Sequence, residues 1–408
     1  MKLKLIAAAL SVSLVACATT ENTTKISAKP LISPTTVLAP AANTQTVNKN
    51  SEVITLEQIM ADPDWFGRAP ESWYWGDDSK TIFYKQKQLG NPLRDLWVKN
   101  VDSNDEAQQV NLSEQHIAAD KNAKTNNDNS LEVYSFEGNV FVKNIASKSV
   151  KQITYTSANE SDTQFLTNGD IAYRVGNIFY SHNLSTGQVV ELANLQMTEK
   201  PKGVEAPSSY LAKEQQKLIS YIALQQRNSE LKEQQKDNLT KENNTITTTK
   251  YYFGKDNRVS HASLSPAGDK LLVSITAAKS SRSDSDIMPN YVTKDGTIAA
   301  EKVRARVANN RQYKEEIFFI DLKKSEKISL SYKTLPDYDT DVLAAVKKEN
   351  FTREGKEYKS KKQARNIHLL QMWFPVKWNE DGSQVALMLE AWDNKTRWLT
   401  TVDFDQKK

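Results

Sequence analysis

The chain has 408 residues, of which 38% are hydrophobic, and its 54 basic side chains nearly balance 50 acidic ones. This balance argues against a nucleic-acid-binding protein, because such a protein needs clustered positive charge on its binding face. No interior apolar run approaches the length of a membrane-spanning helix. The length allows one large all-β domain or two to three smaller domains.

The first 17 residues resemble a bacterial lipoprotein signal. A basic start, Met1–Lys4, precedes an apolar segment, Leu5–Ala16, that is too short to span a membrane. The run L-V-A-C that ends at Cys17 resembles the lipobox, in which the cysteine is lipid-modified and anchors the chain to a membrane. An ordinary secretory signal is the alternative. Because Ala18 follows the cysteine, the resemblance implies a lipoprotein of the bacterial cell envelope, in the outer membrane and facing the periplasm.

The next segment, residues 18–51, predicts a disordered tether. It is rich in Thr, Asn, Ala, Ser and Pro and has almost no large apolar side chains, so it cannot bury enough surface to become ordered. Cys17 is the only cysteine of the chain, which excludes intrachain disulfides.

The predicted folded region, residues 52–408, starts with one or two helical turns. Thr55 is a plausible N-cap, with Gln58 three residues later, and Pro63 ends the helix. Strands follow as short apolar runs separated by turns that contain Gly, Asn or Asp, and in the C-terminal meander the apolar side chains recur at every second residue. In chain order they are expected at Ser72–Trp75, Thr81–Tyr84, Leu96–Asn100, Ala107–Leu112, Val133–Phe136, Val140–Asn144, Val150–Tyr155, Phe165–Leu166, Ile171–Val175, Ile178–Tyr180, Val189–Leu192, His261–Leu264, Leu271–Ile275, Glu315–Leu322 and a C-terminal meander over Phe374–Phe404.

Three polar segments interrupt the strands. Residues 207–239 predict a helical insertion, in which Leu211, Leu218 and Ile222 share one face. We interpret it as an amphipathic helix on the surface of the β domain; a coiled-coil contact with a partner is the alternative, for which there are too few heptads. A polar excursion covers residues 277–313, and residues 337–365 contain a helix-like stretch, Val342–Lys348.

One strand pattern recurs along the chain. An apolar, often aromatic strand that ends in Asn or Asp is found at Leu96–Asn100, Val140–Asn144, Ile317–Asp321 and Leu399–Asp403. The first two copies lie about 44 residues apart. This period predicts an all-β fold, a β-propeller with about five recognisable four-stranded blades in an incomplete ring. A pair of β-sandwiches is the alternative.

The sequence carries no familiar active-site motif. Its thirteen glycines form no nucleophile elbow, phosphate-binding loop or dinucleotide fingerprint. Its histidines are scattered and accompany no cysteine cluster: His116, His182, His261 and His368. We therefore predict no catalytic, cofactor-binding or metal site, although a histidine-centred site assembled from distant segments stays open.

Two other features invite a binding hypothesis. The acidic pair Glu315-Glu316 could hold a substrate amine, and Arg304 and Arg306 a carboxylate, unless all four are solvated residues of a strand edge and a loop. Four tryptophans are expected in the core or between blades: Trp373, Trp378, Trp392 and Trp398.

Several segments resemble prolyl oligopeptidase (S9) family peptidases. The run L-S-P-A-G-D-K over Leu264–Lys270 resembles the S-P-D-G-(K/R) turn of S9 and Tol-system propellers, with Ala267 in place of Asp. The run D-N-K-T-R-W over Asp393–Trp398 is similar to D-N-K-D-R-W of bacterial dipeptidyl-peptidase and acylaminoacyl-peptidase types, with Thr396 where Asp is usual. Supporting similarities lie at Thr55–Ile59 before Asp62-Pro63, at Trp378 and at Asp381-Gly382, so that the resemblance covers Thr55 to Asp405.

In that family the propeller caps an α/β-hydrolase domain with a Ser-Asp-His triad and restricts entry to short peptides. The given sequence contains no such domain. The resemblance therefore implies a non-catalytic propeller portion, as a truncated, fragmentary or split chain, whose partners are short peptides or the missing hydrolase domain. We expect marginal solubility because blades of an incomplete ring expose edge strands. A stand-alone propeller lipoprotein that binds peptides or proteins, and a structural envelope lipoprotein without a ligand, are the alternatives.

Overall fold

The computed structural model describes residues 54–61, 63–118, 122–201, 207–243, 245–247, 249–278, 286–303, 314–370 and 375–404. Cys17, the tether, Arg304, Arg306 and Trp373 lie outside these ranges. The chain divides into two compact units, 1–65 and 66–408. In the first unit, helix α1 (Leu56–Met60) starts where predicted, since the Thr55 hydroxyl accepts a hydrogen bond from the Gln58 amide.

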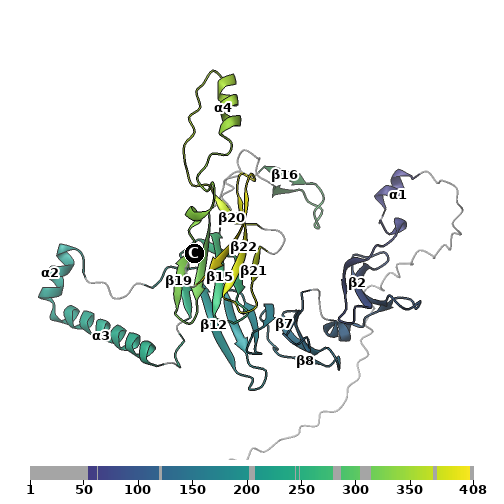
Figure 1. Cartoon of the computed structure of the whole chain (residues 1–408), viewed down its shortest axis with the longest axis horizontal. Coiled ribbons are helices and arrows are strands. Elements are labelled where there is room, and N and C mark those ends of the chain that lie inside the picture. Colours follow the sequence, from purple (N-terminus) through teal and green to yellow (C-terminus); the bar gives the residue numbers. More distant parts are fainter. Residues whose placement is uncertain are drawn as a thin grey trace, which may run out of the picture. The chain divides into compact units, whose positions relative to one another are not determined.

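The second unit is mostly β-sheet, as the recurring short apolar runs and turns predicted (Figure 1). Sheet 1 contains β1 (Glu71–Trp75), β2 (Thr81–Lys87), β3 (Arg94–Asn100) and β4 (Gln108–Gln109). Sheet 2 contains β5 (Lys124–Thr125), β6 (Leu131–Phe136), β7 (Asn139–Asn144) and β8 (Val150–Gln152). Sheet 3 contains β9 (Glu160–Phe165), β10 (Ile171–Val175), β11 (Ile178–His182) and β12 (Val189–Gln196), and β13 (Lys250–Tyr252) joins it parallel to β12.

Two further sheets complete the unit. Sheet 4 contains β14 (Asn257–Leu264), β15 (Lys270–Ala277), β18 (Glu315–Asp321) and β19 (Glu326–Ser329), with the separate hairpin β16 (Ile287–Asn290) and β17 (Ala299–Lys302) inserted after β15. Sheet 5 contains β20 (Ile367–Leu369), β21 (Val376–Trp378), β22 (Gln384–Ala391) and β23 (Arg397–Asp403). Both β20 and β21 pair with β22, at its two ends, while β23 pairs along the length of β22. The four strands of sheet 5 therefore fill three positions.

Every one of these five sheets opens with the same turn. The turn joins the strands at the first two positions of the sheet. In each turn the carbonyl of one residue accepts a hydrogen bond from the backbone amide three residues later, and that later residue has a positive φ. The paired positions are Gly76 and Ser79, Asn126 and Asn129, Leu166 and Gly169, Ser265 and Gly268, and Asn379 and Gly382. Because Ser, Asn and Gly all occupy the positive-φ position, the repeat is a backbone conformation rather than one sequence motif.

The recurring Asn or Asp strand also has one structural position. β3, β7, β18 and β23 each occupy the third position of their sheets. At the ends of the first three, the side-chain oxygen of Asn100, Asn144 or Asp321 accepts a hydrogen bond from a backbone amide two or three residues on. The polar residue therefore shapes the turn toward the fourth strand.

Neighbouring sheets pack face to face through three apolar clusters. Sheets 2 and 3 share a cluster that includes Val140 and Ile171. Sheets 3 and 4 meet through a cluster that includes Phe179 and Val273. Sheets 4 and 5 meet through a cluster that contains Leu272 and several residues of β22. Leu272 and Val273 are neighbours in β15, and successive side chains of a strand point to opposite faces. One face of sheet 4 therefore packs against sheet 5 and the other against sheet 3.

The expected strand at Ala107–Leu112 is largely wrong. Only two of its residues pair, as β4, and Leu112 begins a 3₁₀ helix, Leu112–Ile117. Its sequence is mostly polar, and polar side chains give a strand little apolar surface to bury. Other 3₁₀ turns lie at Pro63–Phe66 and Tyr332–Thr334.

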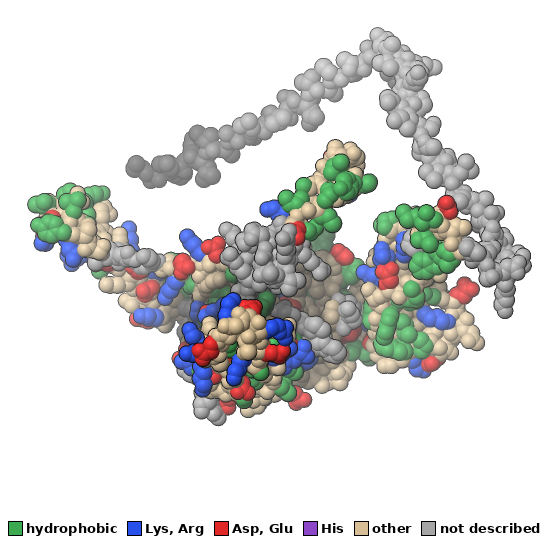
Figure 2. Space-filling view, turned by 90° about the horizontal axis from the view of Figure 1, so that it is seen from above, with side chains coloured by type: hydrophobic (Ala, Val, Ile, Leu, Met, Phe, Trp, Pro, Cys, Tyr) green, Lys and Arg blue, Asp and Glu red, His purple; other side chains and the backbone are tan. Residues whose placement is uncertain are grey.

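The helical insertion consists of two helices, α2 (Tyr210–Leu218) and α3 (Ser220–Glu242). Ser209 caps α2. Neither helix has a buried residue, and Leu218 is 81% exposed, so packing of this segment on the sheets is not observed. The stripe of apolar side chains is too thin to drive such packing. Its exposed hydrophobic side chains are seen at the left of Figure 2.

The excursion between β19 and β20 carries helix α4 (Ala344–Arg353), slightly beyond the stretch expected to be helical (Figure 1). Among the described helices, none is long and apolar enough to cross a membrane. On the face in Figure 2, basic and acidic side chains are interspersed.

Candidate functional site

The acidic pair Glu315-Glu316 does not form an amine-binding site. Successive strand residues point to opposite faces of β18, and Glu315 is only 2% exposed. Its carboxylate accepts hydrogen bonds from the hydroxyls of Ser260, at 2.7 Å, and Ser274, and from the Leu369 amide at 3.0 Å. Glu316 instead pairs with Lys314 near the surface. Glu315 is thus a buried link between sheets 4 and 5, neither a solvated residue nor half of a paired site.

The described tryptophans near the C-terminus pack between elements. The indole nitrogen of Trp378 donates to the Ser263 hydroxyl at 3.0 Å, which joins sheets 5 and 4. That of Trp398 donates to the Pro336 carbonyl at 3.0 Å. The ring of Trp392 lies edge-on to His368, with 5.6 Å between centroids.

The four histidines lie in different parts of the fold. His116 follows β4, His182 is in β11, His261 in β14 and His368 in β20. In the part of the chain that the structure describes, no group of three or more His, Cys, Asp or Glu side chains is arranged to hold a metal ion.

Strands at the first position of sheets 2 to 5 meet at one cavity of about 350 Å³, which we name the first-strand cavity and which Ala172, Tyr173 and Phe179 of β10 and β11 also line. Lys124 comes from β5, Asp162–Gln164 from β9, His261–Leu264 from β14, and Pro375–Lys377 from the start of β21. Segments more than 200 residues apart in the sequence therefore line a single cavity. A local sequence motif could not have predicted it.

His261 is the most unusual side chain of this cavity. Its Nε2 atom is buried and has no hydrogen-bond partner among the described residues. Burial lowers the pKa of His261; Asp162 and Glu315 act against that shift, and Arg174 adds to it. The imidazole is therefore neutral at pH 7, and such a ring offers one donor and one acceptor nitrogen.

Other polar groups of the cavity are partly engaged. Asp162 pairs with Arg174 at 3.3 Å. The Ser263 hydroxyl accepts from Trp378 and keeps its own hydrogen to donate. The Gln164 side-chain nitrogen lies 3.4 Å from the carbonyls of Leu264 and Ser265. This set suits recognition of amide and carboxylate groups. Sequence reasoning missed it, although His261 and Ser263 stand two residues apart and so share a face of β14.

The L-S-P-A-G-D-K run forms the opening turn of sheet 4. The Ser265 hydroxyl accepts hydrogen bonds from the amides of Asp269, at 3.2 Å, and Lys270, at 3.0 Å. The Pro266 carbonyl accepts from the Thr167 amide in the opening turn of sheet 3, at 2.9 Å.

The opening turns of sheets 4 and 5 also pack closely. A Cβ added to Gly382 would lie 3.1 Å from the Ser265 Cβ. The run that resembles the S9 turn is therefore a packing element in which the opening turns of three sheets meet.

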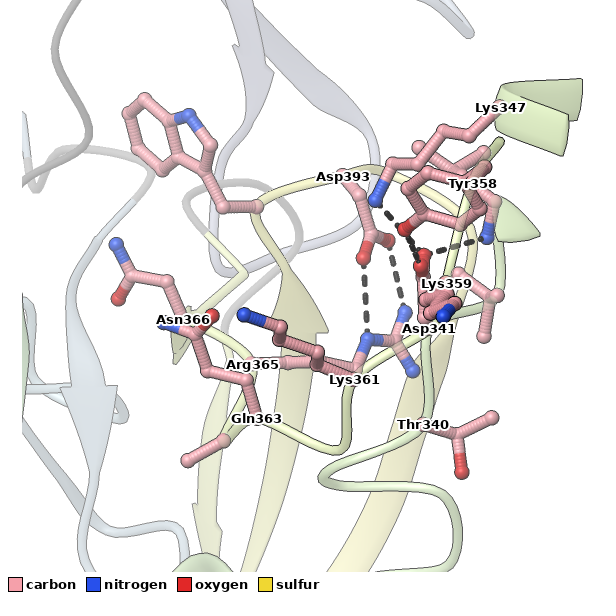
Figure 3. A pocket seen from close by; sticks show the side chains of 14 residues that line it. Thr340, Asp341, Lys347, Tyr358, Lys359, Lys361, Gln363, Arg365, Asn366 and Asp393 are labelled. Carbon is pink, nitrogen blue, oxygen red and sulfur yellow. Dashed lines mark hydrogen bonds and ion pairs between the residues drawn. The ribbon is translucent and has the colours of Figure 1, made fainter. Parts of the chain in front are cut away.

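The D-N-K-T-R-W run forms the turn between β22 and β23 (Figure 3). The buried guanidinium of Arg365 donates to both carboxylate oxygens of Asp393, at 3.0 and 2.8 Å. It also donates to the Thr396 hydroxyl at 2.9 Å and lies 5.3 Å from the ring centre of Trp398. Thr396, at the position where Asp is usual in the S9 pattern, thus still supplies an acceptor to the arginine.

No family model matches the chain, and no curated protein sequence matches it. It is similar to a solved structure assigned as dipeptidyl aminopeptidase IV of Bacteroides ovatus, with 10% identity and a TM-score of 0.32, over 82% of this chain and 35% of the other. A second is Porphyromonas gingivalis dipeptidyl peptidase 4, with 9% identity and a TM-score of 0.38, over 87% and 41%. A third, assigned as TolB of Agrobacterium tumefaciens, has 7% identity and a TM-score of 0.26, over 63% and 62%. The chain spans less than two thirds of each of these proteins.

Proposed function

We propose that the sheets of the second unit are blades of a β-propeller, that this is the non-catalytic propeller portion of an S9-type peptidase, and that its first-strand cavity binds short peptides. The observation that carries the proposal is the meeting, at one cavity, of strands from the first position of four successive sheets. In a propeller, sheets follow one another around a central channel that their first strands line. Face-to-face packing of sheets 2 to 5 and their shared opening turn support the same arrangement.

The chemistry of the cavity supports a peptide as the ligand. Lys124 and Lys377 bring positive charge that suits a carboxylate. His261, Gln164 and Ser263 offer donors and acceptors that suit peptide amides. A volume of about 350 Å³ lies near the lower end for small-ligand pockets, and therefore favours one or two residues of a peptide.

The lipobox residues support a further part of the proposal. We place the chain at the bacterial cell envelope, anchored by a lipid on Cys17, on the basis of the sequence motif. Mass spectrometry of chain expressed in a bacterial host tests this, because lipid attachment adds acyl mass to Cys17 and a Cys17→Ser variant abolishes it.

Peptide binding to the purified chain tests the function. We expect fluorescently labelled di- and tripeptides with free carboxylates to bind, as measured by anisotropy, and His261→Leu to weaken binding at least about tenfold. His182→Leu is the matched control, since His182 is also half-buried but lies outside the cavity. No binding, or equal loss in both variants, would overturn the proposal.

Two further readouts separate the alternatives. A fluorophosphonate probe should label no serine of the chain, because a non-catalytic propeller lacks an activated nucleophile. Peptide binding without any association with a serine hydrolase, when the tagged chain is recovered from its own cells, would instead favour a stand-alone peptide-binding lipoprotein.

A further inference from the structure

A second cavity lies beside the D-N-K-T-R-W turn, away from the first-strand cavity. We name it the insertion cavity, because the excursion between β19 and β20 forms most of its wall (Figure 3). Its volume is about 650 Å³, within the range of small-molecule sites. Trp392 and Asp393 contribute the remaining wall from the turn after β22.

The two carboxylates of this cavity are neutralised by groups already in place. Both carboxylate oxygens of Asp393 accept hydrogen bonds from the guanidinium of Arg365, and Oδ1 also accepts one from the Lys395 backbone amide at 3.0 Å. Burial acts to raise the pKa of Asp393, but the hydrogen bonds from Arg365 and Lys395 outweigh it and lower that pKa. The wall is thereby held together by charge pairs whose oxygens are occupied.

The other carboxylate, Asp341, is engaged in the same way. Its Oδ1 accepts from the Lys347 ammonium at 2.8 Å, and its Oδ2 accepts from the Tyr358 hydroxyl. These hydrogen bonds lower the pKa of Asp341, so it stays ionised at neutral pH and cancels the charge of Lys347. Figure 3 shows this cluster next to the Arg365 and Asp393 pair.

The remaining charge in the cavity is positive. Four basic and two acidic side chains line it. With Arg365 and Lys347 matched to the two carboxylates, Lys359 and Lys361 are left over. Lys359 contacts only the exposed Glu357, at 3.7 Å, and Lys361 has no ion pair or hydrogen bond within the described residues. Among the lining residues the ammonium groups thus leave a surplus of two positive charges, with the exposed Glu357 beside Lys359 outside the lining.

The uncharged wall adds aromatic and amide surface. Trp392 and Tyr358 contribute rings, and Gln363 and Asn366 contribute amides. The Trp392 backbone amide donates to the Asn366 carbonyl at 2.8 Å, which fixes these two parts of the wall to each other. A cavity with two aromatic rings in its wall and surplus positive charge matches a ligand with an apolar ring and an anionic group.

We propose that the insertion cavity binds small organic anions, with Lys359 and Lys361 holding the phosphate or carboxylate group of the ligand and Trp392 contacting its apolar part. This site is separate from the peptide site, since it shares no lining residue with the first-strand cavity. Because both lysines are exposed, binding should weaken as ionic strength rises.

Isothermal titration calorimetry on the full chain tests this site, with four probes: phenyl phosphate, phenylacetate, inorganic phosphate and the neutral benzyl alcohol. We expect both aromatic anions to bind and benzyl alcohol to fail. Inorganic phosphate should bind more weakly than phenyl phosphate, because it lacks the ring. Phenyl phosphate should bind more tightly than phenylacetate, because near neutral pH it carries close to two negative charges and phenylacetate carries one.

The variant Lys359→Ala/Lys361→Ala should weaken binding of phenyl phosphate at least about tenfold. Lys356→Ala/Lys362→Ala is the matched control, because it removes two charges from the same segment but from outside the cavity wall, and should change binding less than about twofold. Absence of binding by both aromatic anions, or equal weakening in the two variants, would overturn the proposal.

The same variants separate this inference from the proposed function. Lys359→Ala/Lys361→Ala should leave peptide binding unchanged, and His261→Leu should leave binding of phenyl phosphate unchanged. Circular dichroism of each variant confirms that its sheets remain folded. The absence of peptide binding would therefore overturn the proposed function without affecting the anion site, and the absence of anion binding would overturn the anion site without affecting the proposed function.

Discussion

Removal of the Glu315 carboxylate should separate sheet 4 from sheet 5 more effectively than any nearby surface change. Glu315→Ala takes away the acceptor of the Leu369 amide and of the hydroxyls of Ser260 and Ser274. A buried group left without a partner costs about 1 to 3 kcal/mol. The oxygens of the two hydroxyls lie 3.0 Å apart and can hydrogen-bond to each other. Most of the lost stability should therefore come from the unpaired Leu369 amide and from the cavity that the missing side chain leaves. We expect a loss of about 3 kcal/mol in the free energy of unfolding.

Urea denaturation followed by tryptophan fluorescence measures this loss. Glu316→Ala is the control, since its side chain is the next on the same strand but half-exposed, and it should change the free energy of unfolding by less than about 0.5 kcal/mol. Glu315→Gln should fall between the two, because the amide oxygen can still accept from Leu369. Equal stability of the Glu315→Ala and Glu316→Ala variants would refute the view that Glu315 links the sheets.

Two further outcomes are expected. Gly382→Ala should lower the free energy of unfolding in urea by about 1 to 2 kcal/mol more than Gly355→Ala does. Both glycines have positive φ, but only at Gly382 would the new Cβ lie 3.1 Å from the Ser265 Cβ. Equal losses in the two variants would contradict the close packing of the turns. The pair of Asp393 and Arg365 should stabilise the chain fully above pH 3.8, the ordinary pKa of the carboxyl, and lose this contribution as pH falls through the lower folded value. Asp393→Asn should flatten this acid limb in melts across that range; an unchanged limb would contradict the assignment.

Local patterns predicted the sheets well for a physical reason. Short apolar runs between turns report strands that are buried on one or both faces, and β6, β7 and β15 were predicted from such runs. The recurring pattern of an apolar strand that ends in Asn or Asp predicted strands that share the third position of their sheets. Whether the sheets form a propeller depends on their mutual arrangement, which stays a proposal.

Features that depend on distant partners could not be predicted. Glu315 resembles a surface residue in sequence, and only its neighbours on β14, β15 and β20 explain its burial. The first-strand cavity draws on four sheets, and the parallel pairing of β13 with β12 spans the whole helical insertion. Pattern within a short window carries no information on such contacts.

The position of β13 has a consequence for the integrity of the chain. β13 follows the helical insertion and leads directly into β14 of sheet 4, yet it is hydrogen-bonded to β12 of sheet 3. The strand therefore holds together two sheets that the insertion separates in sequence. The helices α2 and α3 bury no residue, and a peptide bond between them carries little of the structure. A protease that cuts there should yield two fragments that remain one particle, joined by the β12–β13 ladder and the apolar cluster between sheets 3 and 4. We therefore expect covalent continuity across the insertion to be dispensable for cohesion of the fold.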